Sequence, residues 1–116
     1  MGTAERKAPD ILRGTLDLLI LQALSWGRAH GYDVARRIEA STNDVLAVGE
    51  GSLYPALHRL EARGWVAATW GASDNNRQAR FYTLTARGRA RLRVETSNWL
   101  RYAAAVSAAL GVRPAR

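Results

Sequence analysis

The sequence predicts a mainly α-helical fold with a small β-hairpin and a long helix near its C-terminal end. Three observations predict it. Four segments carry apolar residues at helical spacing, two short β-prone segments flank a polar loop at 71–77, and the last apolar stripe continues as far as Leu110. The chain has 116 residues, which favours a single domain with a modest hydrophobic core.

The composition favours an anionic partner and an intracellular setting. The chain has 17 basic and 10 acidic side chains, a net charge of +7, which suits nucleic acid, an acidic protein or a membrane surface. A soluble protein from an arginine-rich genome is the alternative. Without cysteine the chain has no disulfide and no thiolate metal site, and its start, MGTAERKAPD, lacks the apolar core of a signal peptide. The apolar run Leu18–Leu21 is too short to span a bilayer, so we expect a soluble, cytoplasmic protein.

The first predicted helix is apolar on almost every side. Residues 1–9 are polar and are expected to form a flexible tail. Asp10 or Thr15 is a suitable cap for a helix that runs to about Trp26. Its six leucines and isoleucines leave little polar face, so the helix should be buried or covered by a second chain.

The second predicted helix runs from about Tyr32 to Ala40 after a turn bracketed by two glycines. Val34 and Ile38 lie one turn apart and should face the core, whereas Arg36 and Arg37 should face water. A turn cluster follows, and then a short apolar run at 45–48 that is a candidate strand.

The third predicted helix lies in the segment GSLYPALHRLEARGW and contains a proline. On a wheel of about 100° per residue, Leu53, Leu57 and Leu60 share one face and should pack inward. If Ser52 is the N-cap, Pro55 is the third helical residue, in the first turn, where a missing N–H costs no helical hydrogen bond. The outer face combines small, hydrogen-bonding and cationic side chains that suit a DNA major groove: Ser52, Tyr54, Pro55, His58 and Arg59. Ordinary packing of a helix start is the alternative.

Two strands, at 65–70 and 79–84, and a final helix complete the predicted fold. Thr85 can cap the last helix, which reaches about Leu110. The order helix-helix-strand-helix-hairpin-helix is that of a winged helix-turn-helix with a helical extension. We therefore expect a tail at 1–9, a DNA-binding domain at 10–84, a dimerisation helix at 85–110 and a tail at 111–116.

The hairpin is the predicted wing. Its tip carries Asn75, Asn76 and Arg77, and Arg80 follows on the returning strand, so the wing can enter a minor groove or bind phosphates. A solvated hairpin with surface arginines is the alternative. Four aromatic residues are expected to hold the hairpin to the helices rather than to stack on bases: Trp65, Trp70, Phe81 and Tyr82.

The last helix carries a stripe that predicts a homodimer. Its members alternate by four and three residues, and they are Leu92, Thr96, Trp99, Ala103, Val106 and Leu110. A chain this small cannot easily cover such a helix, so we expect a second copy to cover it together with Leu16 and Ile20 of the first helix. A two-fold dimer would place two recognition helices about 34 Å apart, one turn of DNA. A helix folded back on its own domain is the alternative.

Nothing in the sequence predicts catalysis or a cofactor. His30 and His58 are too few for a metal site or a catalytic base, and no motif for nucleophilic attack or phosphate cradling appears. We expect no enzyme activity, no metal and no cofactor.

Three segments together resemble the PadR family of bacterial transcriptional regulators: HGYDVARRIE, GSLYPALHRLEARGW and NNRQARFYTLTARGR. The resemblance extends from Leu12 to Leu110, and the single final helix resembles the short branch of the family. It implies a homodimeric repressor that binds a palindromic operator in double-stranded DNA, near its own gene or a neighbouring one.

The resemblance also assigns roles to residues. Ser52, Leu53, Tyr54 and Pro55 match the start of the family's recognition helix, and Arg77 and Arg80 match its basic wing. The segment Arg77-Gln78-Ala79 departs from the family, in which Arg-Pro and a further basic residue are common. This departure implies weaker wing binding or a shift of phosphate contact to Arg80.

A drug-sensing branch of the family implies an effector site. There a tryptophan on the last helix stacks on planar apolar ligands at the dimer centre. Trp99 is in a similar place, with Leu16, Ile20 or Tyr102 as neighbours, although simple interface packing is the alternative. Two rival functions are a non-specific nucleic-acid-binding protein and a winged-helix module for protein assembly without DNA binding.

Overall fold

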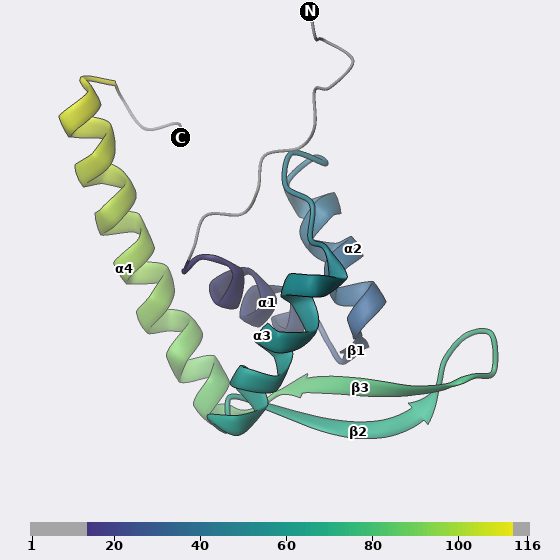
Figure 1. Ribbon diagram of the computed structural model, residues 1–116. Coiled ribbons are helices and arrows are strands. Elements are labelled where there is room, and N and C mark those ends of the chain that lie inside the picture. Colours follow the sequence, from purple (N-terminus) through teal and green to yellow (C-terminus); the bar gives the residue numbers. More distant parts are fainter. Residues whose placement is uncertain (1–13, 113–116) are drawn as a thin grey trace, which may run out of the picture.

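The computed structural model describes residues 14–112, and it confirms a mainly α-helical fold with a small sheet (Figure 1). The elements are α1 (Leu16–Ser25), β1 (Ala29–His30), α2 (Gly31–Ser41), α3 (Glu50–Ala62), β2 (Val66–Ala72), β3 (Gln78–Leu84) and α4 (Ala86–Leu110). The predicted tail at 1–9 and the cap Asp10 lie outside the described residues, as does most of the tail at 111–116.

The sheet has three antiparallel strands in the order β1-β3-β2. The strand predicted at 45–48 is wrong, because that segment forms bends and irregular backbone. The third strand lies before α2 instead, where Ala29 pairs with Tyr82 and His30 with Phe81. A two-residue strand has no room for an alternating pattern, so the sequence carries almost no signal for it.

The core lies between the first three helices and the inner face of the sheet. The third helix packs inward as its leucine spacing predicts, and α1 contributes four further aliphatic side chains. The buried hydrophobic residues are Ile20, Leu21, Ala23, Leu24, Ala29, Val34, Ile38, Leu53, Ala56, Leu57, Leu60, Val66, Tyr82 and Leu84.

Arg37 ties α2 to the end of α1, so the prediction that it faces water is wrong. Its Nη1 donates to the carbonyls of Ala23 (3.1 Å) and Gly27 (2.7 Å), and its Nη2 donates to the carbonyl of Arg28 (3.2 Å). Carbonyls at the end of a helix lack partners within that helix, so a guanidinium satisfies them well. The residue therefore fixes the angle at which the chain turns from α1 into β1.

The third helix begins three residues earlier than the predicted start with Ser52 as its N-cap. Its N-cap is Gly49, and the backbone N–H groups of Ser52 and Leu53 both donate to the Gly49 carbonyl (3.1 and 3.0 Å). Pro55 therefore lies beyond the first turn, and the prediction that it costs no hydrogen bond is wrong. The helix loses the bond that residue 55 would donate to the carbonyl of Gly51. A glycine cap has no side chain to mark the helix start, which explains the error.

The last helix starts against the end of β3, as predicted. The Thr85 hydroxyl accepts from the N–H of Gly88 (3.0 Å), which is the predicted cap. A Cβ added at Gly88 would lie 2.0 Å from the backbone oxygen of Trp65, so only glycine allows this close approach. Figure 1 shows α4 leaving the body of the molecule beyond its contact with α1. No helix within residues 14–112 is both long and apolar enough to span a membrane.

Candidate nucleic-acid interface

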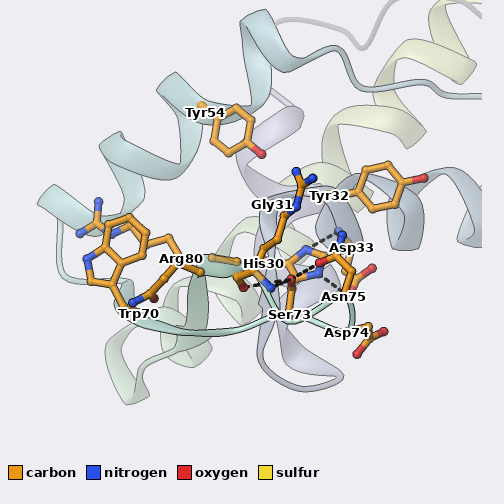
Figure 2. A pocket seen from close by; sticks show the side chains of 13 residues that line it. His30, Gly31, Tyr32, Asp33, Tyr54, Trp70, Ser73, Asp74, Asn75 and Arg80 are labelled. Carbon is orange, nitrogen blue, oxygen red and sulfur yellow. Dashed lines mark hydrogen bonds and ion pairs between the residues drawn. The ribbon is translucent and has the colours of Figure 1, made fainter.

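A cleft separates the hairpin from the starts of α2 and α3. Its volume is about 720 Å³, and we call it the wing cleft. Figure 2 shows Tyr54 of α3, Gly31 and Tyr32 of α2, and Trp70 of β2 around it. Its lining combines aromatic, amide and charged side chains: His30, Gly31, Tyr32, Asp33, Tyr54, Trp70, Ser73, Asp74, Asn75, Arg77, Gln78, Ala79 and Arg80.

The ring of Tyr54 lies directly against Gly31. A Cβ added at Gly31 would be 2.7 Å from both Cε1 and Oη of Tyr54, which is closer than van der Waals contact allows. The far side of Tyr54 borders a smaller hollow of about 210 Å³, which Tyr32 and Arg36 also line. The ring is thus a wall between two hollows, and its position depends on the absence of a side chain at Gly31.

The structure turns most of the predicted helix face outward. Ser52, Tyr54, Pro55 and His58 are exposed along α3. Leu53 is only 2% exposed, so its predicted place among the DNA contacts is wrong, because its side chain packs in the core.

Two of the predicted DNA-binding arginines already have acidic partners. Nη2 of Arg59 lies 2.8 Å from Oδ1 of Asp17 on α1, so this side chain points away from the wing cleft. Nη2 of Arg80 lies 2.9 Å from Oε2 of Glu61, which ties β3 to α3. These bridges are partly exposed, so each contributes about 1 kcal/mol or less to stability.

The wing tip supplies the remaining predicted residues. Arg77 lines the cleft and forms no ion pair with any residue in the range 14–112. Asn76 has a positive φ of 63°, and its N–H donates to the Ser73 carbonyl (2.8 Å), so it shapes the tip. Its neighbour Asn75 lines the cleft instead.

The aromatic residues of the hairpin have different environments. Tyr82 is buried and Trp65 packs against the core, as predicted. Phe81 carries the guanidinium of Arg28 on its ring, with Cζ 4.2 Å from the centroid. Trp70 is 67% exposed, so the prediction that it holds the hairpin to the helices is wrong.

Among the cleft residues that the sequence did not indicate are His30, Tyr32 and Trp70. Only Trp70 had a usable signal, because a tryptophan near the tip of a hairpin extends beyond any core that it could join. His30 enters the cleft as the N-cap of α2, with Nδ1 accepting from the N–H of Asp33 (3.3 Å). A histidine cap is not among the usual capping residues.

Two side chains near the cleft have shifted pKa values. Burial raises the pKa of the Tyr82 hydroxyl, so the phenol stays neutral. The hydrogen bond that Arg36 donates to the Tyr32 hydroxyl (3.2 Å) raises the pKa of Arg36. Within residues 14–112, no group of three His, Asp or Glu side chains could hold a metal ion.

A second hollow, of about 350 Å³, lies between the start of α1 and α4. Trp99 and Tyr102 both line it, with ring centroids 6.1 Å apart, so the structure brings these predicted effector residues together. The neighbour from α1 is Leu18. Ile20 is 0% exposed in the core of its own chain, so its predicted place at an interface or effector site is wrong. Leu16 is half-buried and packs against the core.

The contact between Gly31 and Tyr54 gives a stability test. We expect Gly31→Ala to lower the free energy of unfolding by about 1–3 kcal/mol, because the new methyl must displace the Tyr54 ring. In a Tyr54→Ala background the same change should cost at least about 1 kcal/mol less, since the ring is gone. Urea unfolding of the four proteins measures this coupling.

The matched control is Gly51→Ala, at a helical glycine with nothing within 4 Å of an added Cβ. This change should be neutral or stabilising by up to about 1 kcal/mol. Strictly additive effects of Gly31→Ala and Tyr54→Ala would show that the ring does not rest on Gly31.

Known proteins share both this fold and this sequence pattern. The family model of the transcriptional regulator PadR-like family matches residues 20–94. An uncharacterized protein of Lysinibacillus sphaericus is 30% identical over 90 residues, which are 78% of this chain and 83% of that protein.

Solved structures give the same result. A transcriptional regulator from Clostridium thermocellum is 25% identical, with a TM-score of 0.74 over 82% of this chain and 92% of that one. A PadR-like transcriptional regulator from Bacillus cereus is also 25% identical, with a TM-score of 0.72 over 88% and 97% of the two chains. A PadR family regulator from Eggerthella lenta is 27% identical, with a TM-score of 0.71 over 87% and 86%. The chain therefore belongs to the PadR-like family of transcriptional regulators, has their winged-helix fold, and is not an enzyme.

Proposed function

We propose that this chain is a cytoplasmic homodimeric repressor that binds a palindromic operator near its own gene or a neighbouring one. The observation that carries the proposal is the wing cleft, where the outward start of α3 and the cationic wing tip border one open hollow. A recognition helix enters the major groove with its N-terminal end, and a net charge of +7 favours a phosphate backbone beside it.

The proposed DNA contacts divide into two groups. Ser52, Tyr54, Pro55 and His58 are exposed on α3, so they are the candidates for base edges. Arg77 is the candidate for phosphate contact, with Asn76 shaping the tip that presents it. Arg59 and Arg80 would have to exchange a carboxylate for a phosphate, so we assign them first to holding α3 and the wing in place.

Selection of bound duplexes from a random pool tests this function. We expect a two-fold symmetric motif with half-sites about one DNA turn apart. Arg77→Ala should weaken binding to this duplex and to random duplex similarly, and it should reduce the slope of log K against log salt by about one. Equal affinity for every duplex would favour the non-specific nucleic-acid-binding alternative, and no binding even at low salt would favour the protein-assembly module.

The proposed dimer forms along α4. Its outer half carries apolar side chains that nothing in the described chain covers, and Val106 and Leu110 are exposed there. Thr96 is also exposed, whereas Leu92, Trp99 and Ala103 are half-buried against the same chain. We therefore place the DNA-binding unit at 10–84 and the dimerisation helix at 85–110, with Leu16 beside it on α1.

Val106→Asp tests the dimer. A buried carboxylate without a partner is costly, so we expect the variant to sediment as a monomer at concentrations where the wild type is a dimer. Ala104→Asp is the matched control, because residue 104 is exposed on the same helix outside the predicted stripe. A dimeric Val106→Asp protein would reject the stripe as the interface.

The hollow beside Trp99 is the proposed effector site. Trp99 and Tyr102 give it two aromatic walls, which suit a planar apolar or aromatic compound. We expect such a compound to quench Trp99 fluorescence over the same concentration range in which it releases the operator. Release of DNA that persists unchanged in a Trp99→Ala variant would place the effector elsewhere.

A further inference from the structure

Trp70 lies on the core-facing side of the hairpin, but its side chain extends beyond the edge of the core and is exposed. Residues directly opposite in an antiparallel pair share a face, and three such pairs follow one another here: Val66 with Leu84, Ala68 with Tyr82, and Trp70 with Arg80. The first two pairs cover the core, with Val66, Leu84 and Tyr82 buried. The third pair extends past it, which leaves a large apolar ring 67% exposed.

The charges around Trp70 favour an apolar contact at the ring and an ionic contact beyond it. Arg80, its cross-strand partner, is held by Glu61 at 2.9 Å, so the nearest cation is largely neutralised. Arg77 lines the same cleft toward the tip without a carboxylate partner among residues 14–112. Tyr54 borders the cleft from α3 (Figure 2).

A nucleic-acid backbone has the matching alternation, because apolar deoxyribose faces separate its anionic phosphates. We infer that Trp70 is a DNA-contact residue that packs on a deoxyribose of the strand that Arg77 holds by a phosphate. This inference rests on the proposed function. It adds an apolar, salt-independent contact to a wing whose expected contacts are ionic.

The test compares Trp70→Ala with a matched control, Trp26→Ala. Trp26 is also exposed, at 54%, but lies at the end of α1 and does not line the wing cleft. Each protein is titrated with the symmetric duplex from the selection experiment at several salt concentrations. We expect Trp70→Ala to bind about tenfold more weakly with an unchanged salt slope, because apolar packing of the indole on a deoxyribose involves no counterion release. Trp26→Ala should match the wild type in both.

Fluorescence gives a second readout that needs no large loss of affinity. Duplex should quench the wild-type tryptophan signal, and the quenching should be smaller in Trp70→Phe but retained in Trp26→Phe. The fluorescence comparison also tests the contact between Trp70 and DNA if Trp70→Ala folds poorly, since phenylalanine keeps an aromatic ring at the position.

The outcomes separate the inference from the function on which it rests. If the wild type binds the duplex but Trp70→Ala binds equally well, the inference is overturned and the proposed function stands. A flatter salt slope in Trp70→Ala would also overturn it, because the indole would then act by positioning an arginine. If the wild type binds no duplex at low salt, both fail, and a protein partner becomes the better explanation for the exposed ring.

Discussion

The inner face of α3 is the constraint on which the rest of the interface depends. Leu53, Ala56, Leu57 and Leu60 are buried against the other helices and the sheet. Since they occupy one side of the helix, the side chains between them must face outward. Burying each leucine contributes about 1.5–3 kcal/mol, far more than any surface ion pair in the molecule. The exposed chemistry of the helix is therefore set by hydrophobic packing on its opposite side.

Several arginine side chains stabilise contacts between elements of the fold. Arg37 donates to three carbonyls in the last turn of α1 and just after it, Arg80 joins the wing to α3, and Arg59 joins α3 to α1. The net charge still creates an attractive field for an anion, but these three guanidinium groups already have partners within the chain. This division explains why counting arginines in the sequence overstates the number of candidate contacts.

Elements with a repeating apolar pattern were predictable from the sequence, whereas contacts between single residues far apart in the chain were not. The four helices, the hairpin and the Thr85 cap follow from local patterns that each extend over several residues or use a standard capping group. The two-residue strand β1, the glycine cap of α3 and the long reach of Arg37 depend on neighbours distant in the chain. The same holds for the candidate interface. The helical wheel predicted that Tyr54 and Pro55 face outward, but only the structure shows that the Tyr54 ring lies against Gly31.

The close approach at Gly88 has a mechanical consequence. It seats the first turn of α4 on the carbonyl of Trp65, at the point where the recognition unit meets the long helix. A helix of 25 residues is about 37 Å long. A small tilt of α4 at its packed first turn therefore displaces its far end by a large distance. A tilt of about 5° there moves the far end by about 3 Å, close to the rise of one base pair. In a dimer joined along α4, the distance between the two copies of α3 would therefore depend on the backbone packing at Gly88, which lies outside the wing cleft.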